Sequence, residues 1–205
     1  MRHNYSPTEI IKAEIAALEA IPATNDYAAA VALIREHVHS ERRGRLITSG
    51  MGKAGQIALN MATTFSSTGT PAYFLHPSEA QHGDLGMVCA EDILLLISNS
   101  GKTREILELV DLSRAMHPEI PIILITGKAD CELASRVDVV LSTGDPREVC
   151  PLGLTPTTST TVMTVLGDIL VVQTMEAIGF GPEDYAYRHH GGYLGHKSRA
   201  LCEDK

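Results

Sequence analysis

The stretch Ile93-Leu94-Leu95-Leu96-Ile97-Ser98-Asn99-Ser100-Gly101-Lys102-Thr103-Arg104-Glu105 decides the fold of this chain. Its five leading apolar residues predict a buried strand, and the small polar residues after them predict a turn that opens into a helix. Ser98, Ser100 and Thr103 offer hydroxyl groups beside the unpaired backbone N–H groups of the helix start, which is the composition of a phosphate cradle. Glu105 falls within the first helical turn, where a carboxylate would face the molecule that carries the phosphate. An ordinary capped turn between strand and helix would show the same residue types.

Short apolar runs alternate with helical segments on both sides of this unit. We expect strands at 46–48, 72–75, 93–97, 122–125 and 137–141, and helices at 53–67, 103–116, 131–135 and 157–178. Strands that alternate with helices predict a single α/β domain with a five-stranded parallel sheet, flanked by helices on both faces. The strand order expected for such a sheet is flavodoxin-like, 2-1-3-4-5.

Two amphipathic helices are expected before the first strand. Ser6 and Glu9 form a capping box for a helix over 7–20, on which Ile11, Ile15 and Leu18 share one face, and Asn25 is the expected cap of a second helix. We expect residues 1–40 to pack on the domain or on a neighbouring subunit, residues 41–197 to form the domain, and residues 198–205 to be a C-terminal tail.

Composition narrows the class of partner. The chain has 205 residues, 44% of them hydrophobic, which is enough for a real core. A net charge of −8 without a Lys/Arg-rich run argues against nucleic acid and anionic membranes as partners. Acidic residues at 9, 14 and 19 argue against a signal peptide, and Asp168 within the apolar segment 162–175 favours a buried helix over a membrane span. The four cysteines have no metal or disulfide spacing. We therefore expect a cytoplasmic protein that acts on a small molecule.

The first strand ends in a second glycine-rich loop, Gly50-Met51-Gly52-Lys53-Ala54-Gly55. The loop satisfies the dinucleotide fingerprint G-x-G-x-x-G, but the second strand ends in Leu75-His76-Pro77, without an acidic residue to hold a ribose. Lys53 suits a compact anion or a sugar oxygen better. In the order 2-1-3-4-5 the loops after strands 1 and 3 are neighbours, so Gly50–Lys53 and Ser98–Thr103 should converge on one crevice.

Three further segments carry reactive side chains. His76 and His82 lie in a glycine-flanked loop with two carboxylates; both could bind a metal, and we favour a substrate or structural role for His82. Glu148 lies after the fifth strand, at the edge where such sheets bind ligands. Glycines beside His189 and His190 permit close backbone approach, so this segment could line a site in its own or a neighbouring subunit.

Taken together, these motifs resemble the sugar isomerase (SIS) domain of arabinose 5-phosphate isomerases. The resemblance covers about residues 40–197, and its long loop motif is more specific than the phosphate cradle. The motifs are Gly50-Met51-Gly52-Lys53, Gly69-Thr70-Pro71, His76-Pro77-x-Glu79-Ala80-x-His82-Gly83-Asp84-Leu85-Gly86-Met87, Ser98-Asn99-Ser100-Gly101 and Cys150-Pro151-Leu152-Gly153-Leu154.

The resemblance implies an enzyme that interconverts D-arabinose 5-phosphate and D-ribulose 5-phosphate, supplying Kdo synthesis for lipopolysaccharide or capsule. It implies no required cofactor, an inhibitory zinc contact at His76, and a homo-oligomer, most simply a tetramer with shared active sites. The functional residues that it implies are Lys53, Glu105, Glu148 and His189 for catalysis, and Gly50, Gly52, Gly69, Thr70 and His82 for substrate binding, beside Ser98, Ser100 and Thr103 of the cradle.

Three departures from the family pattern stand out. Lys102 occupies a position where relatives usually have Glu, and His189-His190-Gly191-Gly192 replaces their His-Pro-Gly-Gly, which leaves open which histidine acts. The sequence carries no pair of CBS domains, which relatives often have, so we expect activity to be indifferent to adenine nucleotides.

Isomerisation of an aldose to a ketose needs one base to move a proton between carbons 2 and 1, and a second group to move protons between the oxygens. We assign the first role to Glu148, with Glu105 as its partner or as a sugar anchor. Lys53 would stabilise the enediolate, and His189 would assist ring opening or oxygen protonation. We expect a partly desolvated crevice to raise the carboxylate pKa towards neutrality. The alternatives are a regulatory phosphosugar-binding protein and an isomerase of another sugar phosphate.

Overall fold

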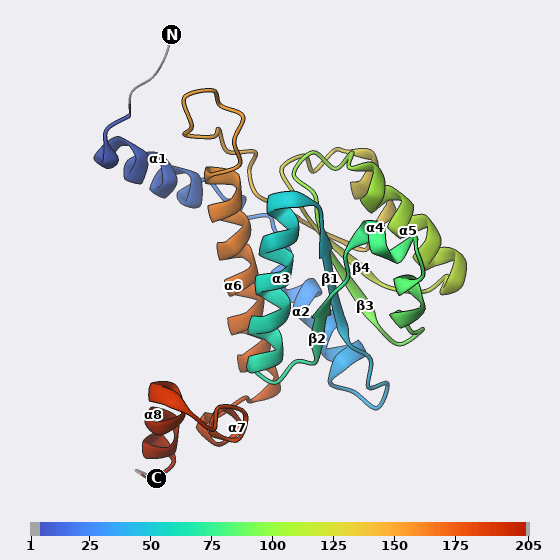
Figure 1. The fold of residues 1–205 in the computed structure, drawn as a ribbon, viewed down its shortest axis with the longest axis vertical. Helices are drawn as coiled ribbons and strands as arrows, with labels where there is room; N and C mark the ends of the chain where they lie inside the picture. The colour runs from blue at the N-terminus through green and yellow to red at the C-terminus, as the bar shows by residue number, and fades with distance from the viewer. Residues whose placement is uncertain (1–4, 204–205) are drawn as a thin grey trace.

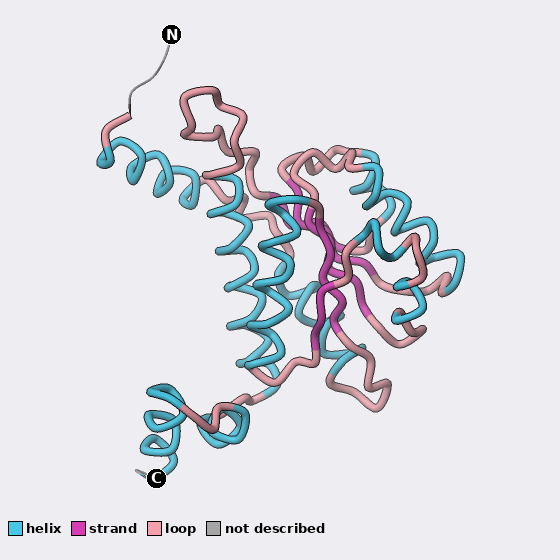
Figure 2. The backbone as a smooth tube through the Cα atoms, in the orientation of Figure 1, coloured by secondary structure: helices cyan, strands magenta, loops and turns pink. Residues whose placement is uncertain are grey.

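The computed structural model describes residues 5–203 and shows one parallel sheet between two layers of helices (Figures 1 and 2). The strand order β2-β1-β3-β4-β5 confirms the predicted order, and every neighbouring pair is parallel. All residues of β1, β3 and β4 are buried, as expected for strands covered on both faces. The strands are β1 (Leu46–Gly50), β2 (Ala72–Phe74), β3 (Ile93–Ile97), β4 (Ile122–Thr126) and β5 (Val139–Ser142).

Eight α-helices lie in the described part of the chain. They are α1 (Pro7–Glu19), α2 (Tyr27–Val38), α3 (Gly52–Ser67), α4 (Pro77–Ala80), α5 (Arg104–Met116), α6 (Thr158–Ile178), α7 (Pro182–Arg188) and α8 (Gly192–Glu203). Two 3-10 turns, Asp84–Met87 and Glu132–Arg136, lie between them.

The side chains of β3 alternate between the two layers of the core. Ile93, Leu95 and Ile97 pack with α2, α3 and α6, while Leu94 and Leu96 pack with α5 on the other face. This alternation follows from the period of two residues along a strand. It explains why the decisive stretch is apolar without interruption: both of its faces are inside.

The long helix α6 is a core helix of the domain. Its length and composition would suffice to cross a membrane, but it packs on α1, α2 and α3. At Gly167 the two helices come so close that a Cβ atom would lie 2.4 Å from Cε of Met61 on α3. This close packing supports the interpretation of 162–175 as a buried helix.

The prediction that Asn25 caps the second helix is wrong. The cap is Asp26, whose Oδ1 accepts from the Ala29 N–H at 2.9 Å. Asn25 instead pairs with β5: its Nδ2 donates to the Ser142 carbonyl at 2.9 Å and its Oδ1 accepts from the Ser142 N–H at 2.8 Å. β5 is an edge strand, so its outer backbone groups need such a partner.

The ends of the chain differ from expectation as well. The capping box of Ser6 and Glu9 is present, but Ile11 and Ile15 remain 59% and 49% exposed, because α1 lies across only the start of α6. The segment after α6 folds into α7 and α8, which pack on each other beyond the sheet (Figure 1). Residue 198 therefore lies inside α8 rather than at the start of a tail.

Candidate active site

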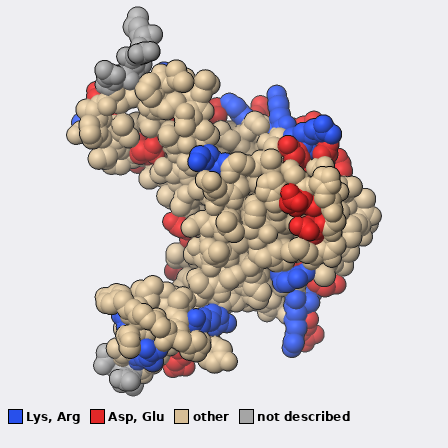
Figure 3. All heavy atoms as spheres, in the orientation of Figure 1, with Lys and Arg blue, Asp and Glu red and all other residues tan. Residues whose placement is uncertain are grey.

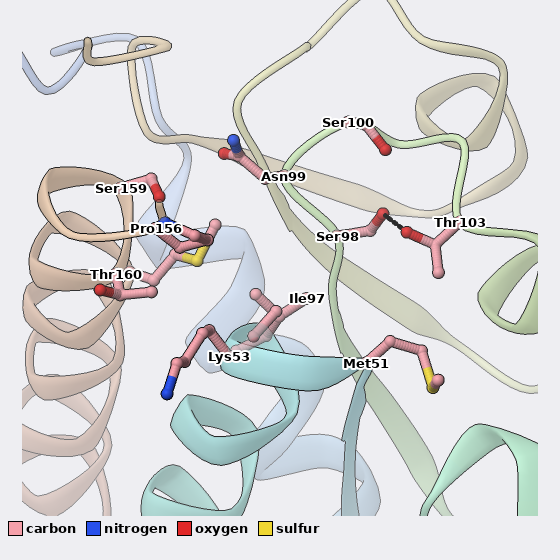
Figure 4. A pocket seen from close by; sticks show the side chains of 12 residues that line it. Met51, Lys53, Ile97, Ser98, Asn99, Ser100, Thr103, Pro156, Ser159 and Thr160 are labelled. Carbon is pink, nitrogen blue, oxygen red and sulfur yellow. Dashed lines mark hydrogen bonds between the residues drawn. The ribbon is translucent and has the colours of Figure 1, made fainter. Parts of the chain in front are cut away.

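A cavity of about 240 Å³ opens at the carboxyl edge of the sheet, between β1 and β3 (Figure 4). Three segments meet there: the start of α3, the turn between β3 and α5, and the start of α6. The predicted convergence of the first two loops is therefore observed. The lining residues are Met51, Lys53, Ala54, Ile97, Ser98, Asn99, Ser100, Thr103, Pro156, Ser159, Thr160 and Met163.

The turn between β3 and α5 is arranged as an anion-binding turn. Ser98, only 2% exposed, shares a hydrogen bond of 2.9 Å with the Thr103 hydroxyl (Figure 4), and Ser100 Oγ accepts from the Lys102 N–H at 3.2 Å. Thr103 is the N-cap of α5 but makes no side-chain bond to the helix backbone. Among the described residues no acceptor is found for the N–H groups of Arg104 and Glu105 in the first helical turn, where the helix dipole favours an anion.

Gly101 makes this turn possible. Its φ of +61° is one that side chains rarely adopt, and an added Cβ would lie 2.1 Å from Sγ of Cys131. The backbone therefore passes too close to the buried Cys131 for any larger residue. This requirement explains why glycine follows Ser100.

The first glycine-rich loop packs the start of α3 onto the end of β1. A Cβ on Gly55 would lie 2.4 Å from the carbonyl oxygen of Gly50. Lys53 follows Gly52 in the first turn of α3 and extends towards α6 in Figure 4; its Nζ is 3.5 Å from Oε1 of Gln56. The lysine is exposed and faces the cavity without an ion-pair partner among the described residues.

Glu148 lies behind the cavity wall, in the loop after β5. Its Oε2 accepts three hydrogen bonds at the start of α6: from the Thr157 N–H at 2.7 Å, the Thr157 hydroxyl at 2.9 Å and the Ser159 N–H at 3.3 Å. The carboxylate itself does not line the cavity, but Ser159 beside it does. Glu148 is therefore fixed at the cavity wall by the end of a helix.

The expectation of a raised carboxylate pKa is wrong for Glu148. Burial raises the pKa of Glu148, but the hydrogen bonds from Ser159 and Thr157 outweigh burial, so the pKa lies below the ordinary value of glutamate. Each of these bonds favours the charged carboxylate. The group is therefore an ionised carboxylate at neutral pH.

Cys150, two residues further along the same loop, shows a related effect. Its Sγ accepts from the Thr155 N–H at 3.1 Å and the Leu154 N–H at 3.2 Å. The bonds from Thr155 contribute most and lower the pKa of Cys150 to about 7. The loop thus folds around this sulfur before it enters α6.

Two further predicted residues lie near the cavity without lining it. Glu105 is half-buried in the first turn of α5, one position after Arg104. His82 is exposed after α4, and its neighbour Gln81 donates to Oε2 of Glu108 on α5 at 2.7 Å. Both lie at the carboxyl edge, but neither side chain is part of the cavity wall.

Gly69, Thr70 and His189 lie at the opposite edge of the sheet. Gly69 and Thr70 follow the end of α3, where Thr70 Oγ1 is 3.0 Å from Nε2 of His39. His189 follows α7 and stacks on Tyr185, with 3.9 Å between ring centroids. The 21 residues of α6 separate its start at the cavity from α7, a length of about 30 Å.

These residues therefore do not complete the cavity within one chain. Loops from helix to strand lie at the amino edge of a parallel sheet, and loops from strand to helix at the carboxyl edge. Gly69 and Thr70 belong to a loop of the first kind, so the structure does not bring them to the turn between β3 and α5. The end of α3 instead forms a shallow groove with Arg188 and His189.

His76 is the residue assigned to zinc. Its Nδ1 is buried without a hydrogen-bond partner, and its ring meets Phe74 edge-on with 6.2 Å between centroids. Over the described residues, no three His, Cys, Asp or Glu side chains are grouped closely enough to hold a metal ion. A zinc ion at His76 would need ligands brought from elsewhere.

The contribution of α6 was missed by sequence reasoning. Pro156, Ser159 and Thr160 form one wall of the cavity, and Thr157 holds Glu148. The signal that could have found them is the hydroxyl-rich helix start Thr157–Thr161, directly after a loop from the carboxyl edge.

Comparison with known proteins agrees with this architecture. The model of the SIS domain family matches residues 40–173, most of the chain. The chain belongs to the SIS domain family. In this SIS domain, the matched region contains both loops of the cavity and the start of α6.

Several curated relatives of this SIS domain are named arabinose 5-phosphate isomerase KdsD. Arabinose 5-phosphate isomerase KdsD of Shigella flexneri is 49% identical over 155 residues, which is 76% of this chain and 47% of the relative. KdsD of Pseudomonas aeruginosa is 45% identical over 162 residues, 79% of this chain and 49% of the relative. The chain thus spans about half the length of the curated relatives it matches.

Two solved structures match the SIS domain over nearly their whole length. One is described as a phosphosugar isomerase involved in capsule formation from Bacteroides fragilis, with 62% identity, a TM-score of 0.88 and coverage of 91% of this chain and 96% of that chain. The other is c3406 of E. coli CFT073 in complex with arabinose 5-phosphate, with 32% identity, a TM-score of 0.81 and coverage of 90% and 100%.

Proposed function

We propose that this protein is an aldose–ketose isomerase that interconverts D-arabinose 5-phosphate and D-ribulose 5-phosphate through an enediol. The observation that carries the proposal is one cavity that joins the serine-rich turn to Lys53 and to Ser159, whose N–H holds the ionised Glu148 behind the cavity wall. The names of the KdsD relatives and the sugar phosphate bound to c3406 support this substrate.

The chemistry follows from the separation of roles in the cavity. The hydroxyls of Ser98, Ser100 and Thr103 and the N-terminus of α5 bind the phosphate. Glu148 removes the proton from carbon 2 and returns it to carbon 1, using the Oε1 oxygen, to which no described residue donates. Lys53 offsets the negative charge on the enediolate oxygen. None of these steps requires a redox cofactor or a metal.

We assign the proton transfers at the sugar oxygens to His189 of a second chain. His189 lies beyond the far end of α6, so it would reach the cavity of another copy rather than its own. A second copy could bind in the concave surface between the α1 end and the α7–α8 end of the molecule. The atoms along this surface belong mostly to uncharged residues (Figure 3). The assembly proposed here is a symmetric homo-oligomer with shared sites, most simply a tetramer.

Cellular setting completes the proposal. All four cysteines are free thiols, which suits the reducing cytoplasm. The capsule-related description of the Bacteroides fragilis relative supports a role in supplying Kdo for capsule or lipopolysaccharide.

A panel of aldose phosphates tests the activity. The purified protein is incubated with each sugar, without added nucleotide or metal, and ketose formation is measured. We expect D-arabinose 5-phosphate to be converted to D-ribulose 5-phosphate and unphosphorylated arabinose to be left unchanged. Faster turnover of a different aldose phosphate would reassign the substrate, and tight binding without turnover would point to a regulatory phosphosugar-binding protein.

A further inference from the structure

The side chain of Asn99 lines the cavity, and no step of the proposed reaction uses it. Asn99 is exposed and lies between the two serines of the turn from β3 to α5. In Figure 4 its amide extends from the turn towards Ser159 at the start of α6, on the opposite side from the hydroxyls of Ser98 and Ser100. The amide and the two hydroxyls therefore face different parts of the same cavity.

The turn is held by the backbone of Asn99 and not by its side chain. The carbonyl oxygen of Asn99 accepts from the Gly127 N–H at 3.0 Å and from the Thr126 hydroxyl at 3.3 Å. Asparagine in a turn commonly bonds its side chain to the nearby backbone, but within residues 5–203 no hydrogen bond to this amide is found. The shape of the turn thus leaves the amide without a structural role.

The position of the amide is nevertheless defined, because Gly127 leaves room for it. A Cβ added at Gly127 would lie 2.7 Å from Oδ1 of Asn99 and 3.0 Å from its carbonyl oxygen. Gly127 is not among the residues with a positive φ, so its own backbone conformation does not call for glycine. The close approach of Asn99 does call for it. The amide therefore packs against the end of β4 on one side and is open to the cavity on the other.

The chemistry of the amide fits the sugar better than the phosphate. An asparagine side chain offers one acceptor oxygen and two donor hydrogens, and a hydroxyl group can both donate and accept. A phosphate dianion only accepts, and the groups that we propose bind it, Ser98, Ser100 and the start of α5, lie on the other side of the turn.

We infer that Asn99 is a substrate-binding residue, whose side-chain amide forms hydrogen bonds with hydroxyl groups of the sugar beyond its phosphate. The inference rests on the proposed function and deepens it, since it names the part of the substrate that this side chain recognises. Asn99 would thus select for a hydroxylated chain, while its neighbours in the turn bind the phosphate that any sugar phosphate carries.

The test compares three ligands by calorimetric titration. D-Arabinitol 5-phosphate carries the hydroxyls of the sugar but has no carbonyl group to react, n-pentyl phosphate has the same chain without hydroxyls, and inorganic phosphate has no chain. Each is titrated into the wild type, Asn99→Ala and the matched control Asn60→Ala. Asn60 is an exposed residue of α3 that does not line the cavity.

We expect Asn99→Ala to weaken binding of D-arabinitol 5-phosphate about tenfold and to leave binding of n-pentyl phosphate and inorganic phosphate unchanged. Asn60→Ala should match the wild type. Asn99→Ser, whose shorter side chain cannot reach as far, should show the same split and serves if thermal melting shows that the alanine variant does not fold.

Two results would overturn the inference. One is equal affinity of the wild type and Asn99→Ala for D-arabinitol 5-phosphate. The other is equal weakening of all three ligands, which would place the amide at the phosphate. A wild-type protein that binds D-arabinitol 5-phosphate but forms no ketose from D-arabinose 5-phosphate would instead overturn the proposed isomerase activity.

Discussion

Glu148 shows how a single side chain can be both a structural cap and a proposed base. All three of its hydrogen bonds reach Oε2, and each of them comes from the first residues of α6. One oxygen therefore fixes the carboxylate to the helix, and the other is left for substrate. The same bonds keep the group ionised at neutral pH.

Removing one donor should change the pH dependence of the reaction. Thr157→Val keeps the backbone N–H but deletes the hydroxyl that donates to Glu148, so the pKa of Glu148 should rise towards its ordinary value. We expect the acid limb of the kcat/KM profile to move to higher pH. Thr164→Val is the control, because its hydroxyl bonds only to the carbonyl of Thr160 within α6. If the acid limb does not move, the Thr157 hydroxyl does not set the pKa of the catalytic base.

The same linkage predicts how stability depends on pH. The pKa of Glu148 is lower in the folded than in the unfolded protein, so its contribution is present above the unfolded pKa and is lost as pH falls through the folded pKa. Thr157→Val should therefore lose stability at neutral pH and lose less of it in acid, which denaturant titration at two pH values would measure.

The phosphate-binding turn should govern substrate affinity. Ser100→Ala and Thr103→Ala each delete a hydroxyl that can donate to the phosphate, and a hydrogen bond to a charged group contributes about 1.5–3 kcal/mol. We expect each variant to raise KM about tenfold or more with a smaller effect on kcat. Ser135→Ala, whose hydroxyl bonds to the Glu132 carbonyl away from the cavity, is the control. Efficient turnover of arabinose without its phosphate would contradict this role.

Metal should hinder rather than help the reaction. Every proposed step uses side chains alone, so treatment with a chelator should leave the activity intact. Added zinc should depress it by binding His76, and His76→Ala should be less sensitive to zinc. The measurement is initial rate against zinc concentration for both proteins. Activity that disappears with chelator and returns with zinc would require a different mechanism.

At the scale of elements, the active site depends on how tightly β3 turns into α5. The backbone at Gly101 has a positive φ and passes directly beside Cys131. The turn between the strand and the helix therefore requires glycine at position 101. This requirement fixes the backbone of the turn Ser98–Thr103, which we propose binds the phosphate.

Gly101→Ala should consequently damage both stability and binding. A positive φ for alanine costs about 1–3 kcal/mol, and the clash with Cys131 adds to it. We expect a lower free energy of unfolding and a higher KM for the sugar phosphate. Gly86→Ala is the matched control, since an added Cβ there meets nothing within 4 Å. Chemical denaturation and KM would be compared, and equal stability of the two variants would show that the turn can rearrange.

At the scale of the whole molecule, the proposed catalytic groups lie at two ends. Lys53 and Glu148 are at the start of α6, while His189 follows its end. No bend within α6 brings these ends together (Figure 1). The proposed mechanism therefore requires two chains for a complete site, and the exposed apolar side chains Ile11 and Ile15 of α1 and Val172 of α6 offer surface for the proposed contact.

Mixing two inactive variants tests this arrangement. Glu148→Ala and His189→Ala should each fold, as circular dichroism would show, and each lose turnover by roughly 10²-fold or more. Mixed oligomers should regain partial activity, because some sites then receive Glu148 from one chain and His189 from the other. A fully active monomer, or verified mixed oligomers without recovery, would show that each chain builds its own site.

Much of this molecule could be predicted from the sequence because the information is local. The uninterrupted apolar run Ile93–Ile97 specifies a strand buried on both faces, and its period and the turn after it need no distant residue. The convergence of Lys53 with Ser98–Thr103 followed from strand order alone. The meeting of these two loops, where we propose that the phosphate binds, was therefore open to prediction.

Only the tertiary structure decided the rest, because the deciding partners lie far apart in the chain. Asn25 is a residue type that commonly caps helices, yet it pairs with Ser142 because β5 is an edge strand. Glu14 is one acidic residue on an amphipathic helix until α6 places Thr158 beside it. Glu148 has a lowered rather than a raised pKa because the hydrogen bonds from the start of α6 lower its pKa by more than burial raises it. The helical conformation of α6 likewise separates His189 from the cavity. The sequence gives the number of residues between them, but the distance follows only when that segment is known to be a straight helix.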